Sequence, residues 1–178
     1  MRETDRPLIL PPLRRNCFAA RTVAETLHRG QKDKAGRPYM GHITRVHDRL
    51  VDLLEGLPND QWDEARQIAW LHDVIEDTPY TVVDLALEGF SNDVVMGVDA
   101  LSKPGGRLPY LDWINHLATT APLAVILVKI ADIEDNSDPE RLALLDEPTR
   151  ERLTAKYGAA LPILKDAAAR LGWRKGCA

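Results

Sequence analysis

The sequence of 178 residues has few of the features that mark exported or membrane-spanning proteins. It contains only two cysteines, Cys17 and Cys177, which lie near opposite ends and exclude a disulfide framework or a closely spaced zinc pair. We therefore expect free thiols and a cytoplasmic location. The apolar stretch 8–10 is too short for an export signal. The longest apolar run, 121–128, contains Pro122 and falls well short of the roughly 18 residues that suggest a membrane span.

A surplus of positive charge is also missing. The chain has 23 Lys and Arg against 27 Asp and Glu, so its formal net charge of −4 provides no global attraction to nucleic acid or an anionic membrane. Aromatic residues make up only 6%, but apolar residues reach 44%, which is enough to bury one core. We expect a proline-rich irregular arm over residues 1–12 and one compact domain over residues 13–178.

Hydrophobic periodicity predicts helices along the chain, because apolar residues recur at three- and four-residue steps and no segment alternates with period two over a useful length. The apolar run at 123–135 is compatible with either a buried helix or a strand, and we interpret it as a helix. The sequence thus predicts an all-α fold. Helices are expected at 16–30, 42–57, 60–76, 81–87, 92–101, 110–117, 123–135 and 149–171.

A basic loop separates the first two predicted helices. Residues 29–38 mix glycine and proline with Arg29, Lys32, Lys34 and Arg37, and they lack apolar periodicity. These side chains give an acidic protein a local patch that can offset phosphate charges. The loop is therefore a candidate anion-binding segment.

The most informative stretch is AWLHDVIEDT at 69–78, where ionisable groups interrupt an apolar helix. Residues four apart share a helix face, so these groups form one polar corner. Burying them unpaired would cost several kcal/mol, and a metal ion is the simplest compensation. The dipeptides His-Asp at 72–73 and Glu-Asp at 76–77, each taken alone, are more typical of a solvated helix end. The four groups are His72, Asp73, Glu76 and Asp77.

Polar residues in two other segments of the chain support the hypothesis of a metal site. Lys129, Asp132 and Asn136 interrupt the most apolar run of the chain, and the last two share a helix face. His42 lies at the start of the second predicted helix, directly after the basic loop. Two nitrogen and two oxygen donors from three helices suit Mn²⁺, our first choice, or Fe²⁺ or Zn²⁺. The expected ligands are His42, His72, Asp73 and Asp132.

These residues resemble the H…HD…D signature of the HD-domain metal-dependent phosphohydrolases, an all-helical family. The fuller pattern resembles the RelA/SpoT-type hydrolase domain, and specifically the small stand-alone alarmone hydrolases. The likeness covers roughly residues 16 to 145, and the chain is too short to hold a synthetase domain as well. The matching segments are HRGQ at 28–31, GRPY at 36–39 with His42, LHDVIEDT at 71–78, and KIAD at 129–132 with Asn136.

The resemblance implies a phosphohydrolase that uses one Mn²⁺ to remove the 3′-pyrophosphate of (p)ppGpp, with pyrophosphate as a product. It assigns metal binding to the two histidines and two aspartates above. Glu76 and Asp77 match the acidic pair that positions and deprotonates the attacking water, a role that carboxylates can fill. The basic loop, the tyrosine that directly follows it as a candidate pocket wall, and the third motif supply the candidate substrate-binding residues. These are Arg29, Lys32, Lys34, Tyr39, Lys129 and Asn136.

Two departures from the family pattern concern the substrate. Asp33 stands where relatives usually carry a basic residue, and its carboxylate could accept an amino group from guanine or adenine, which leaves a ppApp-type alarmone open. Residues 133–136 read IEDN where relatives usually have Arg-Leu-His-Asn. We interpret the run 132–135 as partly solvated, with only Asp132 committed to metal.

Two other functions remain open from the sequence. One is an HD-type phosphatase that acts on another nucleotide, for example by removing the 2′-phosphate of NADPH. The other is a catalytically silent module that binds an alarmone, and the intact pair Glu76 and Asp77 argues against it. No nucleic-acid or membrane partner is expected. His28, His47 and His116 are interpreted as scaffold or solvated residues instead of metal ligands.

Overall fold

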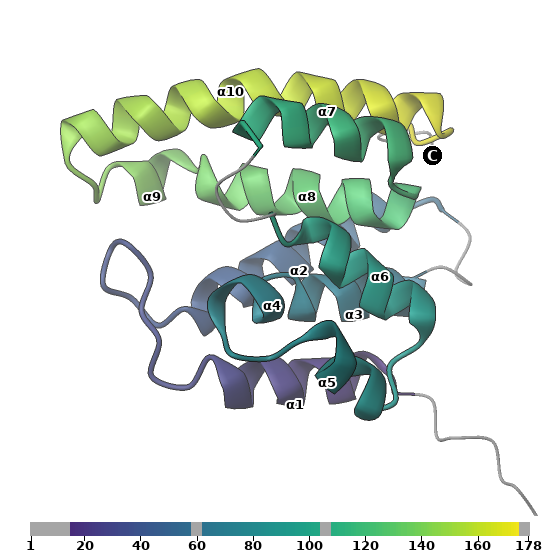
Figure 1. Cartoon of the computed structure of the whole chain (residues 1–178). Helices are drawn as coiled ribbons and strands as arrows, with labels where there is room; N and C mark the ends of the chain where they lie inside the picture. Colours follow the sequence, from purple (N-terminus) through teal and green to yellow (C-terminus); the bar gives the residue numbers. More distant parts are fainter. Residues whose placement is uncertain (1–14, 58–61, 104–107, 175–178) are drawn as a thin grey trace, which may run out of the picture.

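The computed structural model describes residues 15–57, 62–103 and 108–174, and within these ranges it confirms the all-α prediction (Figure 1). The expected irregular arm at 1–12 lies outside the described residues. Among the helices described, none is both long and apolar enough to cross a membrane. The helices are α1 (Cys17–Leu27), α2 (Met40–Leu54), α3 (Trp62–Leu71), α4 (Val74–Asp77), α5 (Val82–Leu87), α6 (Asn92–Leu101), α7 (Tyr110–Thr120), α8 (Leu123–Asn136), α9 (Pro139–Leu142) and α10 (Glu147–Arg170).

Helix α8 forms the centre of the molecule. It packs against α2 on one side and α10 on the other, with α7 beside α10 (Figure 1). Its residues from Val125 to Ile133 are all buried, since the segment is apolar on every face. This packing explains why the run 123–135 is a helix although its pattern alone also fits a strand. The polar side chains of α8 therefore project from the core of the protein.

The predicted helix at 60–76 is interrupted, so the expectation of one continuous helix is wrong. α3 ends at Leu71 and α4 begins at Val74, with Asp73 at φ −104° and ψ −1°. Nδ1 of His72 lies 2.8 Å from the carbonyl oxygen of Ala69, and such a side-chain hydrogen bond competes with the helical ladder. Leu71 and Val74 on either side are fully buried, which holds the break in place.

Two local features were not predicted from the sequence. Phe18, the second residue of α1, is 77% exposed. The buried face of α1 consists of smaller residues, Cys17, Ala20 and Ala24, which allow α1 to lie close to α3. Helix α9 is absent from the predicted set. It starts at Pro139, and the side chain of Asp138 accepts hydrogen bonds from the first turn.

The central position of α8 predicts that its apolar residues dominate stability. Leu127→Ala should lower the free energy of unfolding by about 2 to 5 kcal/mol, because Leu127 is fully buried and the truncation leaves a cavity. Leu87→Ala is the matched control, since Leu87 is 81% exposed, and it should change stability by less than about 0.5 kcal/mol. Urea denaturation measures both, and equal effects would contradict the central role of α8.

Candidate metal centre and active-site cavity

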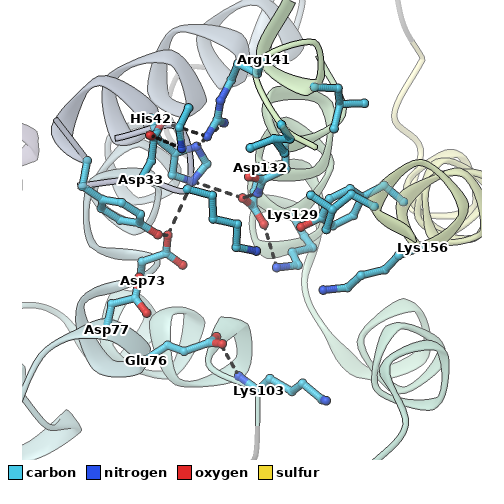
Figure 2. Close-up of a pocket in the computed structure, with 18 of the residues that line it drawn as sticks. Asp33, His42, Asp73, Glu76, Asp77, Lys103, Lys129, Asp132, Arg141 and Lys156 are labelled. Carbon is cyan, nitrogen blue, oxygen red and sulfur yellow. Dashed lines mark hydrogen bonds and ion pairs between the residues drawn. The ribbon is translucent and has the colours of Figure 1, made fainter. Parts of the chain in front are cut away.

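Three of the four residues predicted to bind metal, His42, Asp73 and Asp132, line one cavity of about 360 Å³ (Figure 2). The fourth, His72, does not line it but contacts Asp73. The loop between α1 and α2 forms one wall of this cavity, the α3–α4 junction and α8 form its floor, and α7, α9 and α10 complete it. Helices distant in the sequence therefore bring their polar side chains to one place.

The two histidines and the two aspartates meet at short distances. Nε2 of His42 lies 3.5 Å from Oδ2 of Asp73 and 3.4 Å from Oδ1 of Asp132. Nε2 of His72 lies 3.0 Å and 3.8 Å from the same two oxygens. One donor atom each from His42, His72 and Asp73 lies within 4.8 Å of the others, which makes these residues a candidate metal-binding group.

The orientation of both imidazole rings fits a metal ion. His72 uses Nδ1 toward the carbonyl of Ala69, and its buried Nε2 has no hydrogen-bond partner. His42 uses Nδ1 toward Oδ2 of Asp135 at 2.7 Å, so its Nε2 also points to the centre. Metal-binding histidines usually donate their second nitrogen in this manner, which leaves the lone pair on the other nitrogen for the ion. The unpartnered Nε2 of His72 shows that the residues present fit a divalent cation.

The electrostatics of the cluster are dominated by its carboxylates. Burial opposes protonation of His42, but hydrogen bonds with Asp132, Asp135 and Asp73 outweigh it and raise the pKa of His42 well above its usual range. Burial would raise the pKa of Asp132, yet the nearby Lys129 and the two histidines hold that pKa well below its usual range. The cluster therefore attracts positive charge, and a bound cation would displace protons from the imidazoles.

Hydrogen bonds hold both aspartates in place from outside the cluster. The hydroxyl of Tyr39 donates to Oδ2 of Asp73 at 2.5 Å. Lys129 donates to Oδ2 of Asp132 at 2.7 Å, and Asn136 donates to Oδ1 at 2.6 Å. Tyr39, Lys129 and Asn136 were predicted to bind substrate. All three line the cavity, and in this structure each of them also positions a candidate ligand.

The acidic pair lies beside the cluster. Glu76 and Asp77 are exposed residues of α4 that line the cavity (Figure 2). The backbone N–H of Lys103 donates to Glu76 at 3.4 Å, and the side chain of Gln31 donates to Asp77 at 3.4 Å. Partial desolvation raises the pKa of Glu76, which makes its carboxylate a better proton acceptor.

The basic residues divide into those inside and those outside the cavity. Lys32 and Lys34 line it as predicted for substrate contacts, whereas Arg29 is exposed and does not line it. Sequence reasoning missed Lys103 and Lys156, which line the opposite side. Lys156 lies on α10 and packs over the ring of Tyr110 at 4.1 Å. In the sequence it is an ordinary lysine of a long helix, and no pattern distinguishes it.

Asp33 is engaged by the protein itself. Its Oδ1 accepts hydrogen bonds from the backbone N–H groups of Ala35 and Arg37 at 2.9 Å and 3.0 Å. Its Oδ2 lies 3.4 Å from the guanidinium of Arg141. Both carboxylate oxygens have protein partners, which argues against the alternative that Asp33 accepts an amino group of the base.

The interpretation of the run 132–135 as partly solvated is wrong for Asp135. This side chain is fully buried and contacts His42, Arg45 and Arg141. Glu134, beside it in the sequence, points away from His42 and pairs with Lys165 at 2.8 Å. The only sequence signal for Asp135 is an acidic residue in a buried helix, and its partners are too distant in the chain to suggest a role.

The remaining histidines take no part in the candidate metal group. His28 is buried and its Nδ1 lies 2.7 Å from the side chain of Gln31. His47 is stacked on Trp70, with ring centroids 4.5 Å apart, and accepts a hydrogen bond from Arg66 at 3.1 Å. Both are scaffold residues, in line with the sequence interpretation. Cys17 is a buried free thiol, and Cys177 lies outside the described residues.

The helical fold thus brings the histidines and aspartates of the H…HD…D pattern together. No family model matches the chain. It is similar to a guanosine-3′,5′-bis(diphosphate) 3′-pyrophosphohydrolase of Haemophilus influenzae, with 35% identity over 121 residues, 64% of this chain and 17% of that protein. A GTP pyrophosphokinase of Streptomyces coelicolor is 32% identical over 157 residues, 84% of this chain and 17% of that protein.

Two further proteins are similar to this chain, one in sequence and one in structure. The bifunctional (p)ppGpp synthase/hydrolase SpoT of Escherichia coli is 31% identical over 159 residues, 84% of this chain and 21% of that protein. A solved structure, described as a metazoan ortholog of SpoT that hydrolyses ppGpp, matches with a TM-score of 0.68 and 22% identity over 88% of this chain and 91% of that chain. The chain spans about a fifth or less of these bacterial relatives. The chain is therefore similar, over much of its own length, to part of each of these bacterial proteins, and it shares the fold of the metazoan ortholog.

Proposed function

We propose that this protein is a metal-dependent phosphohydrolase that removes the 3′-pyrophosphate of a guanosine alarmone of the (p)ppGpp type. The observation that carries this proposal is the meeting of His42, His72, Asp73 and Asp132 at one end of a cavity that also contains an acidic pair and several lysines. Four curated or structural relatives whose names concern (p)ppGpp or GTP pyrophosphorylation support the substrate class.

The metal ligands in this proposal are the two histidines and two aspartates, with Mn²⁺ as the first choice and Fe²⁺ or Zn²⁺ as alternatives. A mixed nitrogen and oxygen donor set supports this range of metals. A cation at this place would neutralise phosphate charge and lower the pKa of a coordinated water. Tyr39, Lys129 and Asn136 would keep the carboxylates of Asp73 and Asp132 in position through the hydrogen bonds described above.

The acidic pair supplies the proton chemistry. Glu76 is the proposed general base, because its carboxyl group lines the cavity and because desolvation raises its pKa, which makes the carboxylate a better proton acceptor. Asp77 would help to orient the attacking water. The presence of this pair beside the cluster supports an enzyme over a silent binding module, since simple binding of an anion is weakened by nearby carboxylates.

The charges of the cavity support a polyanionic nucleotide. Lys32 and Lys34 on the loop face Lys103 and Lys156 on the other side, so phosphates on both sides of a ribose could be neutralised. Arg29 lies outside this arrangement, and we propose for it only a weak contribution from the surface. The cytoplasmic location inferred from the two cysteines stays a prediction.

A nucleotide panel tests the function. The protein with added Mn²⁺ should release pyrophosphate from ppGpp and pppGpp, and treatment with EDTA should abolish the reaction because the ligands lose their ion. Chromatography of the products, with ppApp and NADPH in parallel, separates the alternatives. Faster release of orthophosphate from NADPH would favour the second HD-type function. Binding of ppGpp without any hydrolysis would indicate the silent module.

A further inference from the structure

Asp135 is the most buried charged group in the part of the chain that the structure describes, and it lies directly behind a candidate metal ligand. Its Oδ2 lies 2.7 Å from Nδ1 of His42, on the ring edge opposite the cavity centre. It lines no part of the cavity, so it cannot touch a substrate. Its location therefore gives it an effect on the site only through its neighbours, of which His42 and Arg141 line the cavity.

Three guanidinium groups surround the same carboxylate. Arg45 of α2 donates to Oδ1 at 2.7 Å and to Oδ2 at 3.2 Å. Arg141 of α9 contacts Oδ2 and also the backbone oxygen of Asp135 at 3.2 Å. Arg49 lies 3.7 Å from Oδ1. Arginines from α2 and α9 thus fix the orientation of both carboxylate oxygens of Asp135. The oxygen that contacts His42, Oδ2, is therefore held in place.

Arg141 extends this network to the basic loop. Its second terminal nitrogen lies 3.4 Å from Oδ2 of Asp33, whose other oxygen holds the loop backbone. The loop that presents Lys32 and Lys34 to the cavity is therefore linked to His42 through Asp33, Arg141 and Asp135. Figure 2 shows Asp33, Arg141 and His42 on this side of the cavity.

We propose that Asp135 is a positioning residue that fixes the ring of His42 for metal binding, and that Arg141 couples it to the loop on the substrate side. The inference rests on the proposed function for the identity of the ion. Without the carboxylate, His42 can rotate, and the unbalanced guanidinium groups behind it oppose a dication. Outer partners of metal-binding histidines typically change metal affinity by about 10- to 100-fold.

The test is the affinity of the purified full chain for Mn²⁺, measured from the electron paramagnetic resonance signal of the free ion. Asp135→Asn should weaken Mn²⁺ binding by about 10- to 100-fold. The matched control is Glu134→Gln, which removes one negative charge at the neighbouring position of α8 and breaks only the pair with Lys165. The control should bind Mn²⁺ as the wild type does.

Activity provides a second readout. Because Asp135 does not line the cavity, kcat of Asp135→Asn should return to within about threefold of wild type at saturating Mn²⁺. A merely structural role would lower kcat at every Mn²⁺ concentration. If Asp135→Asn does not fold, as judged by circular dichroism, Arg141→Lys decides instead. Lysine cannot span Asp135 and Asp33 together, so this variant should bind Mn²⁺ about tenfold more weakly.

The outcomes separate this inference from the proposed function. Equal Mn²⁺ affinity in wild type and in a folded Asp135→Asn or Arg141→Lys variant would overturn the inference alone. A wild-type protein that binds no Mn²⁺ would overturn the metal centre together with the inference. Weaker binding in the variants supports the inference even if the nucleotide panel reveals another substrate.

Discussion

Asp73→Ala is expected to abolish both Mn²⁺ binding and turnover. Oδ2 of Asp73 is the carboxylate oxygen nearest to Nε2 of His72, at 3.0 Å, and it lies 3.5 Å from Nε2 of His42. Its removal takes away a charged donor and leaves two imidazoles that repel a cation once protonated. Metal analysis after dialysis against Mn²⁺, together with pyrophosphate release from ppGpp, measures the two effects.

The matched control for this variant is Asp93→Ala. Asp93 is an exposed aspartate in the first turn of α6 and does not line the cavity. It should retain wild-type Mn²⁺ content and activity. A wild-type Mn²⁺ content in Asp73→Ala would show that Asp73 is not a ligand, and the arrangement proposed for the site would have to be abandoned.

Glu76→Gln is expected to lower kcat by about 10²- to 10⁴-fold, the usual range for a positioned proton acceptor. The amide keeps the shape of the side chain, and its oxygen can still accept the hydrogen bond from the backbone of Lys103. Mn²⁺ affinity and KM should therefore change little. Steady-state kinetics on ppGpp, with Mn²⁺ affinity measured in parallel, distinguishes loss of a base from loss of binding.

The pH profile provides an independent check on Glu76. Desolvation raises the pKa of Glu76, so the active carboxylate form increases as pH rises through a value above the usual range of glutamate. The acidic limb of kcat/KM should follow that titration in the wild type and disappear in Glu76→Gln. Asp77→Asn serves as the comparison, and a greater loss of kcat there would transfer the role of base to Asp77.

Much of the fold could be predicted because its signals are local. Thr81 and Ser91 each accept a hydrogen bond from the first turn of the following helix, as expected from their residue types. The candidate ligands were also found locally, since a histidine or aspartate in an apolar stretch is costly without a partner. These signals can be recognised in the sequence without information on how the helices pack against one another.

The features that the sequence did not reveal depend on contacts between distant residues. Asp135 and His42 are 93 positions apart, and Arg141 and Asp33 are 108 apart, so neither pairing leaves a spacing pattern. Lys156 faces the cavity only because α10 packs on α8. The break after Leu71 arises from a side chain that competes with the backbone, which helical periodicity does not register.

That break determines which changes of chain length the site can accept. In an unbroken helix, adjacent residues project about 100° apart, and the turn between α3 and α4 instead directs both His72 and Asp73 toward one point. Inserting or deleting one residue there would reorient one ligand relative to the other, whatever its chemical type. The histidine–aspartate pair should therefore stay contiguous.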